Sequence, residues 1–282
     1  VLLKPSQPLQ ADVLEQALHA LVAHHDALRL NFNQGPQGWQ ATFAAAGGQR
    51  LLWDRSIDAI EDLQALGNDA QRSLDLGNGP LLRALLVTLP QGEQRLLLAI
   101  HHLAVDGVSW RILFEDLQSA YNQLLGGKTP KLPLKTSSVK AWAEQLQAYA
   151  RSEALQHELA YWQTHLAQAP VDLPCIDPHA SLDGQQVAIA RTELSKVHTA
   201  QLLLEAPAAY RTQVNDLLLT ALARVITRWT GDASTLVQME GHGREDLFDE
   251  VDLTRTVGWF TSLYPVKLTP AAELGASIKQ VK

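Results

Sequence analysis

The sequence has 282 residues, of which 46% are hydrophobic and 19% are charged, an ordinary balance for a soluble globular protein. Its formal net charge of −7, without any cluster of lysine and arginine, argues against nucleic acid and anionic membranes as partners. The single cysteine, Cys175, excludes a disulfide within the chain and a cysteine metal cluster. With no signal peptide and no apolar run of membrane-spanning length, these features favour a cytoplasmic protein.

The first half of the chain predicts alternating helices and strands. Asp12 and Glu15 are spaced like a capping box and begin an amphipathic helix that ends near His24. The patterns then predict strands over 28–32 and 39–43, a helix over 59–74, strands over 81–89 and 94–101, and a helix over 108–125.

The second half continues in the same way after a long helical stretch, 138–168, that we expect to be broken once. The proline-marked crossing 169–178 predicts a boundary between two subdomains, 1–170 and 171–282. Beyond it the patterns predict a strand over 185–194, helices over 196–206 and 212–229, and strands over 234–240 and 265–268. Mixed strands and helices predict an α/β protein in layers. The chain begins without methionine and stops within an expected helix, so we expect a piece of a longer polypeptide.

The segment of most interest is residues 101–107, which read HHLAVDG. It joins a buried strand to an amphipathic helix. Because side chains alternate along a strand, His101 and His102 point in opposite directions, and we expect one to pack while the other faces a cleft. Asp106 and Gly107 form the turn. The N–H groups at the start of the next helix can hold an oxyanion beside a histidine that takes a proton.

Two histidine pairs allow other interpretations. A pair at the end of a strand is often structural or a metal site, but the opposite directions of His101 and His102, and the lack of a third ligand at convincing spacing, disfavour a metal. We expect no metal site in this chain. The second pair, His24 and His25, ends a helix before a strand and favours a structural role.

Four stretches carry a resemblance to a known family. Residues 101–113, HHLAVDGVSWRIL, resemble the HHxxxDG signature of the condensation-domain superfamily of nonribosomal peptide synthetases, and the VSWR that follows is similar to the epimerization domains of that superfamily. Residues 210–222, residues 240–245 (EGHGRE) and residues 256–266 (TVGWFTSLYPV) resemble three further stretches of epimerization domains, in the expected order.

The resemblance implies a chloramphenicol-acetyltransferase-like pseudo-dimer of two α/β subdomains, the second of them incomplete, which would leave Leu217, Leu218 and Val225 partly uncovered. It implies epimerization of an L-aminoacyl or peptidyl thioester. The substrate would be tethered to the phosphopantetheine of a peptidyl carrier protein domain, with adjacent synthetase domains as further partners and no cofactor bound by this chain.

The resemblance also assigns roles to residues. It implies that His102 and Glu240 are catalytic and face each other across the substrate, and a half-buried carboxylate at the end of a strand suits such an acid/base role. Asp106 would pair structurally with an arginine, for which Arg244 is the candidate, rather than being an exposed turn residue. The remaining candidates are Gly107 and Val108 as oxyanion donors, His101 as a structural residue, and Trp259, Tyr264 and Asn215 as lining of the cleft or as packing residues.

Inversion of an α-carbon explains the need for two acid/base groups, because a proton leaves one face and another arrives on the opposite face. A condensation domain forming peptide bonds would share His102 and Asp106 but has no general need of an acid at Glu240. Two further functions stay open, a carrier-docking module without chemistry and a free acyltransferase.

Overall fold

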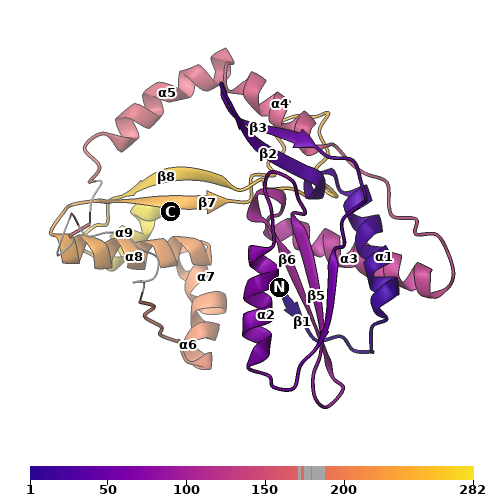
Figure 1. Cartoon of the computed structure of the whole chain (residues 1–282). Coiled ribbons are helices and arrows are strands. Elements are labelled where there is room, and N and C mark those ends of the chain that lie inside the picture. Colours follow the sequence, from indigo (N-terminus) through magenta and orange to yellow (C-terminus); the bar gives the residue numbers. More distant parts are fainter. Residues whose placement is uncertain (171–172, 175–178, 180–187) are drawn as a thin grey trace. The chain divides into compact units, whose positions relative to one another are not determined.

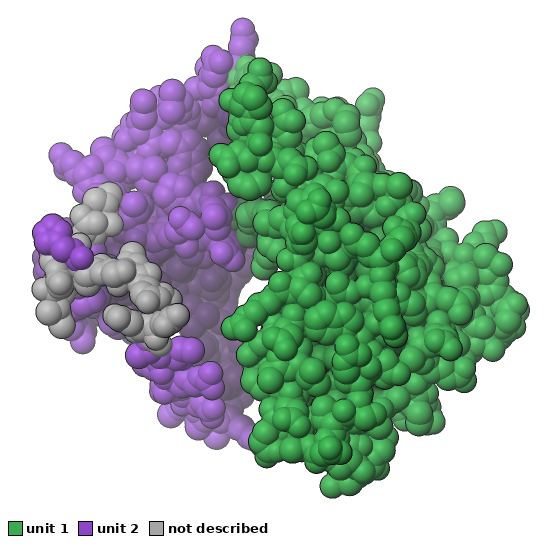
Figure 2. All heavy atoms as spheres, viewed as in Figure 1, with its two compact units in different colours: residues 1–152, 242–262 green, residues 153–241, 263–282 purple. Residues whose placement is uncertain are grey.

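The computed structural model describes residues 1–170, 173–174, 179 and 188–282 (Figure 1). The chain forms two compact units, coloured separately in Figure 2. Unit 1 comprises Val1–Ser152 with His242–Ser262, and unit 2 comprises Glu153–Gly241 with Leu263–Lys282. Residues 242–262 therefore pack with the N-terminal part of the chain. The division into subdomains at 170 and 171 stays a prediction, since residues 171–172 lie outside the described chain.

Unit 1 is built on a four-stranded sheet in the order β1 (Leu2–Leu3), β6 (Gln94–Ile100), β5 (Leu82–Thr88), β4 (Leu52–Ser56). The two predicted strands at 81–89 and 94–101 are confirmed and pair antiparallel. β4, which the sequence analysis missed, runs parallel to β5 at the edge of the sheet. Its outer residues are polar and exposed, so it has no apolar pattern to detect.

Helices cover both faces of this sheet (Figure 1). α1 (Ala11–His24) and α3 (Gly107–Leu125) pack together on the face that carries Leu82, Ala84 and Leu86, and α2 (Asp62–Arg72) packs on the face that carries Leu85 and Val87. A strand buried on both faces is mostly apolar, which fits Leu82 and the run Ala84–Val87 of β5. Arg83 is the exception: it is buried, and its guanidinium donates to the Ser73 hydroxyl and lies over the Trp53 ring.

The remaining elements of unit 1 follow the prediction closely. A 3-10 turn, η1 (Asp26–Arg29), leads into the antiparallel hairpin β2 (Leu30–Gly35) and β3 (Gly38–Phe43). The expected long helix is broken into α4 (Val139–Tyr149) and α5 (Glu153–Leu166), the second of which belongs to unit 2. The capping box at Asp12 is wrong: Gln10 is the N-cap, and the Glu15 carboxylate accepts from the backbone N–H groups of Leu51 (2.9 Å) and Leu52 (2.6 Å), at the start of β4.

Unit 2 contains, after α5, the continuous segment α6 (Lys196–Ala200), η4 (Gln201–Glu205) and α7 (Ala206–Tyr210), then α8 (Val214–Thr230), and α9 (Leu274–Val281). β7 (Thr235–Gly241) and β8 (Ser262–Leu268) form a two-stranded sheet. The strand predicted over 185–194 is wrong for its described part, because residues 188–194 are exposed and pair with no described strand. Residues 185–187, and Cys175, lie outside the described residues. Within the described chain, no helix has the length and apolar character needed to cross a bilayer.

Candidate active site

The HHLAVDG segment is a turn between β6 and α3, and its two histidines have different surroundings. β6 ends at Ile100, and a 3-10 turn, η2 (His102–Ala104), follows at once. The His101 Nδ1 accepts a hydrogen bond from the backbone N–H of Leu103 at 3.2 Å, and its ring is half-buried. His102 is exposed and has no such tie to the backbone in the described structure. The structure thus separates one half-buried histidine from one exposed histidine, but the 3-10 turn that begins at His102 makes this difference, and not the predicted alternation along a strand.

Asp106 is the N-cap of α3 and is buried, with its side chain 5% exposed. Its Oδ1 accepts from the Ser109 backbone N–H at 2.8 Å and from the Ser109 hydroxyl at 2.7 Å. Its two carboxylate oxygens also accept from Arg244, at 3.0 Å from Nη2 and 3.2 Å from Nε. The structure therefore brings Asp106 and Arg244 together as a bidentate ion pair, the geometry in which such pairs are strongest.

Arg244 fixes the loop 253–260 as well. Its Nη1 donates to the carbonyl oxygens of Leu253 (3.0 Å) and Thr256 (2.8 Å), and its guanidinium lies 4.1 Å from the centre of the Phe260 ring. Burial lowers the pKa of Arg244, and the charge of Asp106 opposes that shift. With only 8% of its side chain exposed, Arg244 acts here as a structural residue rather than as a ligand-binding group.

Gly243 lets its own backbone lie close to the backbone of Phe260. Its φ is +65°, in the left-handed region, and a Cβ there would lie 1.6 Å from the carbonyl oxygen of Phe260. The neighbouring His242 is exposed, and its Nδ1 accepts from the backbone N–H of Arg244 at 3.0 Å. The EGHGRE stretch therefore places an arginine beside the turn at Asp106.

The start of α3 offers backbone donors next to the exposed histidine. The first N–H groups of a helix have no partner within the helix. The N–H of Ser109 is taken by Asp106, but Gly107 and Val108 are both exposed at the first two positions of α3. Their N–H groups are the ones that a ligand oxygen can reach.

Trp259, a predicted lining residue, lies beside His102 within unit 1. The two rings make an edge-to-face contact with centroids 5.9 Å apart and planes at 79°. Trp259 remains 44% exposed. The other two lining candidates, Tyr264 on β8 and Asn215 on α8, are exposed within unit 2.

Glu240 lies on β7 in unit 2, and the expectation that it is half-buried is wrong. Burial alternates along this end of β7, so that Met239 is half-buried whereas Gln238 and Glu240 are exposed on the same face of the strand. A two-stranded sheet cannot cover both of its faces, which explains the exposure. The structure therefore describes Glu240 as an available carboxylate, and its catalytic role stays a prediction.

The second histidine pair belongs to a buried ion-pair network that the sequence analysis missed. His25 Nε2 lies 2.9 Å from Asp116 Oδ2, and Arg255 donates to Asp116 Oδ1 at 2.6 Å. His24, His25 and Asp116 have donor atoms within 4.8 Å of one another, a spacing that a metal ion can use. Because both oxygens of Asp116 already have partners and Arg255 brings a positive charge, the network is explained as structural.

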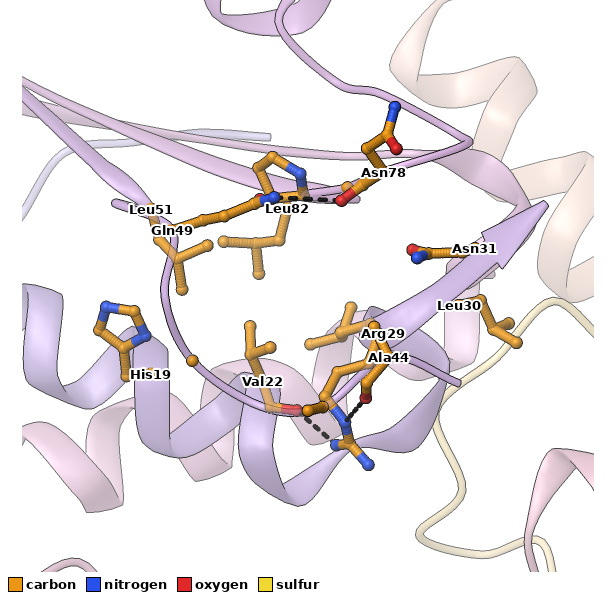
Figure 3. Close-up of a pocket in the computed structure, with 15 residues that line it drawn as sticks. His19, Val22, Arg29, Leu30, Asn31, Ala44, Gln49, Leu51, Asn78 and Leu82 are labelled. Atoms are coloured by element: carbon orange, nitrogen blue, oxygen red, sulfur yellow. Dashed lines mark hydrogen bonds between the residues drawn. The ribbon is translucent and has the colours of Figure 1, made fainter. Parts of the chain in front are cut away.

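A separate cavity of about 130 Å³ lies in unit 1 beside α1 and the hairpin (Figure 3). Arg29 donates to the carbonyl oxygens of Val22 (2.8 Å) and Ala44 (3.1 Å), and Gln49 donates to that of Asn78 (3.0 Å). None of the predicted site residues lines this cavity. We therefore do not place the candidate site in this cavity.

Comparisons with known proteins identify the family of the chain. The family model of the condensation domain matches residues 1–282. The chain is 47% identical over 274 residues to a linear gramicidin synthase subunit of Brevibacillus parabrevis, and this match covers 93% of the chain and 4% of that protein. It is 40% identical over 293 residues to a plipastatin synthase subunit of Bacillus subtilis, covering 100% of the chain and 11% of that protein. The chain thus spans a small part of these relatives.

Solved structures similar to this chain include domains of peptide synthetases. The epimerization domain from the third module of tyrocidine synthetase B matches with a TM-score of 0.91 and 38% identity, covering 100% of this chain and 66% of that one. The first condensation domain of the calcium-dependent antibiotic synthetase has the same fold, with a TM-score of 0.74 and 20% identity. These matches confirm the predicted chloramphenicol-acetyltransferase-like α/β pseudo-dimer fold. Matched over its whole length by the family model, the chain belongs to the condensation-domain family.

Proposed function

We propose that this chain is an epimerization domain, which inverts the α-carbon of an L-aminoacyl or peptidyl thioester. The observation that carries the proposal is the whole-chain likeness to the epimerization domain of tyrocidine synthetase B, at 38% identity and a TM-score of 0.91. The condensation domain of the calcium-dependent antibiotic synthetase is only 20% identical, at a TM-score of 0.74. The VSWR stretch after Gly107 and the EGHGRE stretch support the same choice.

The substrate in this proposal arrives on a carrier. Its acyl group is a thioester of phosphopantetheine, which belongs to a peptidyl carrier protein domain and not to this chain. The likeness to large synthetases supports adjacent synthetase domains as neighbours. The chain itself needs no cofactor, because a proton transfer at the α-carbon involves no change of oxidation state.

The chemistry requires two proton carriers. One group removes the α-proton from one face, and the electron pair of the broken C–H bond moves into the thioester carbonyl to form an enolate. The second group delivers a proton to the opposite face, and the carbonyl re-forms. We assign these two tasks to His102 and Glu240. The N–H groups of Gly107 and Val108 are the donors assigned to the enolate oxygen.

The surroundings of the turn support this assignment of His102. His101 is tied to the Leu103 N–H, and Asp106 is committed to Ser109 and Arg244. A buried carboxylate that already accepts from both of these residues cannot act as a free base. His102 is left as the exposed group of the turn that can exchange a proton with a ligand.

The test uses the parent synthetase with its carrier loaded with an L-aminoacyl thioester in deuterated water. We expect deuterium at the α-carbon and the D residue in the released product. A condensation domain would instead join the acyl group to a downstream acceptor without α-deuterium. A docking module would bind the carrier and do neither. Either of these two results would overturn the proposal.

A further inference from the structure

We propose that Trp259 is a positioning residue for the His102 imidazole, and that Ser109 and Gly258 hold Trp259 in place. The inference deepens the proposed function and rests on it for its kinetic consequences. Edge-to-face contact is a preferred geometry for two aromatic rings, worth more than the area it buries. The His102–Trp259 contact has this geometry. It restricts how the imidazole can turn, and so fixes the direction of its nitrogens.

Core packing does not force this contact. His102 is exposed and Trp259 is 44% exposed, so neither ring belongs to the buried core. We infer that the backbone on both sides of the tryptophan sets its position. The loop 253–260 supplies that constraint, because both neighbours of Trp259 in the chain are fixed within unit 1.

The first constraint is the Ser109 hydroxyl, which belongs to a residue that is 0% exposed. A hydroxyl has one hydrogen and two acceptor sites. The hydrogen lies nearest to Asp106 Oδ1, with the oxygens 2.7 Å apart. The oxygen accepts from Arg244 Nη2 and from the Gly258 backbone N–H, both at 3.1 Å. Every site of the hydroxyl is used, and the residue before Trp259 is thereby bound to the first turn of α3.

The second constraint is steric. A Cβ at Gly258 would lie 2.7 Å from Val139 Cγ2 and 2.9 Å from a ring carbon of Phe260, which is closer than side chains tolerate. Phe260 is itself buried, in a cluster with Trp142 and Leu253. Trp259 is thus the exposed residue between two neighbours that are packed without room to move. Its ring lies next to His102.

The experiment compares Trp259→Leu, Trp259→Phe and Ser109→Ala in the parent synthetase. Trp39→Leu, which replaces an exposed tryptophan on the hairpin of unit 1, is the matched control. Two quantities are measured at one pH: deuterium wash-in at the α-carbon, and the rate at which diethyl pyrocarbonate modifies His102, followed by peptide mass spectrometry. His19, on α1 of the same unit, is the internal reference for an intact fold.

We expect Trp259→Leu to lower kcat for wash-in by about 2- to 10-fold with little change in KM, the effect of losing one aromatic pair. Modification of His102 should become faster because its ring loses a neighbour, while a general loosening of the fold would also speed the modification of His19. Trp259→Phe should restore both quantities, Ser109→Ala should shift both in the direction of Trp259→Leu, and Trp39→Leu should change neither. Modification of His19 should stay constant throughout.

The two proposals fail in different ways. An unchanged modification rate at His102 in Trp259→Leu, with wash-in intact, would overturn the positioning role and leave the epimerase standing. Faster modification of His102 in Trp259→Leu, without any wash-in in the unsubstituted protein, would support the positioning role and overturn the epimerase. A response in Trp259→Leu but none in Ser109→Ala would remove Ser109 from the proposal.

Discussion

The two proposed acid/base groups lie in regions of very different packing. In unit 1 the strand that precedes His102 belongs to a sheet covered by helices on both faces, and the turn is held by buried hydrogen bonds. In unit 2, Glu240 lies on a two-stranded sheet, and the buried apolar side chains among its described residues are only Ala223, Leu268 and Ile278. His102 therefore follows a strand that is packed on both faces within its own unit. Glu240 lies on a strand that few buried side chains of its own unit support.

The largest effect on stability is expected from breaking the Asp106–Arg244 ion pair, which holds the turn in unit 1. Arg244→Ala leaves a buried carboxylate without its partner, and we expect the free energy of unfolding to fall by about 3–5 kcal/mol in urea denaturation. Arg151→Ala, which replaces an exposed arginine of unit 1, is the control and should change it by less than about 0.5 kcal/mol. A loss below about 1 kcal/mol for Arg244→Ala would contradict the claim that this pair supports the turn.

Core truncation measures the difference between the two units directly. Leu85→Ala removes a fully buried side chain of β5 and should cost about 2–5 kcal/mol. Val225→Ala on α8, where the side chain is 63% exposed, should cost less than about 0.5 kcal/mol. Thermal unfolding of both variants checks this. Equal losses would mean that α8 is covered as completely as the sheet of unit 1.

A single methyl group tests the tight fit of the loop 253–260. Gly258→Ala brings a Cβ against Val139 and Phe260, and we expect a loss of about 1–3 kcal/mol in the free energy of unfolding. Gly107→Ala is the matched variant for stability, since no atom lies within 4 Å of its added Cβ. If both variants unfold at the same urea concentration, the loop is not packed as described.

The smallest expected effect is a dependence of stability on pH at His24. Burial, and repulsion by His25, Lys135 and Arg255, lower the pKa of His24 below 6.5, although Asp116 opposes the shift. The unfolded chain therefore binds more protons as the pH falls below 6.5, so stability decreases from there down to the folded pKa. His24→Gln should flatten the fall in urea midpoint between about pH 7 and about pH 5. An unchanged slope would contradict this origin.

Much of unit 1 could be predicted because its sequence patterns are local. The mainly apolar β5, the stripe on α3 and the turn at Asp106 each follow from neighbouring residues. β4 could not be predicted, because only its contact with β5 and the Glu15 carboxylate define it. The strand expected over 185–194 fails in its described part for the converse reason, since an alternating pattern needs a partner strand.

The candidate site also contains residues that local patterns predict and residues that only contacts between distant parts of the chain define. The difference between His101 and His102 was predicted from strand alternation, whereas in the structure a 3-10 turn after Ile100 produces it. The resemblance to epimerization domains supplied Arg244 as the partner of Asp106. The His25–Asp116–Arg255 network and the bonds of Ser109 to Arg244 and Gly258 were missed because these partners lie more than ninety residues apart in the chain. The burial expected for Glu240 was wrong because it requires a covered sheet face, which β7 and β8 alone do not provide.

Exchange in the two single variants tests the central claim, that two groups serve opposite faces of one α-carbon. The parent synthetase carrying His102→Ala or Glu240→Gln is loaded with L- and, separately, D-aminoacyl thioester in deuterated water, with His157→Ala and Glu158→Gln as exposed controls on α5. The account predicts that each variant loses inversion, that any surviving exchange is confined to opposite starting enantiomers in the two variants, and that the controls remain active. Full inversion by either His102→Ala or Glu240→Gln would contradict it.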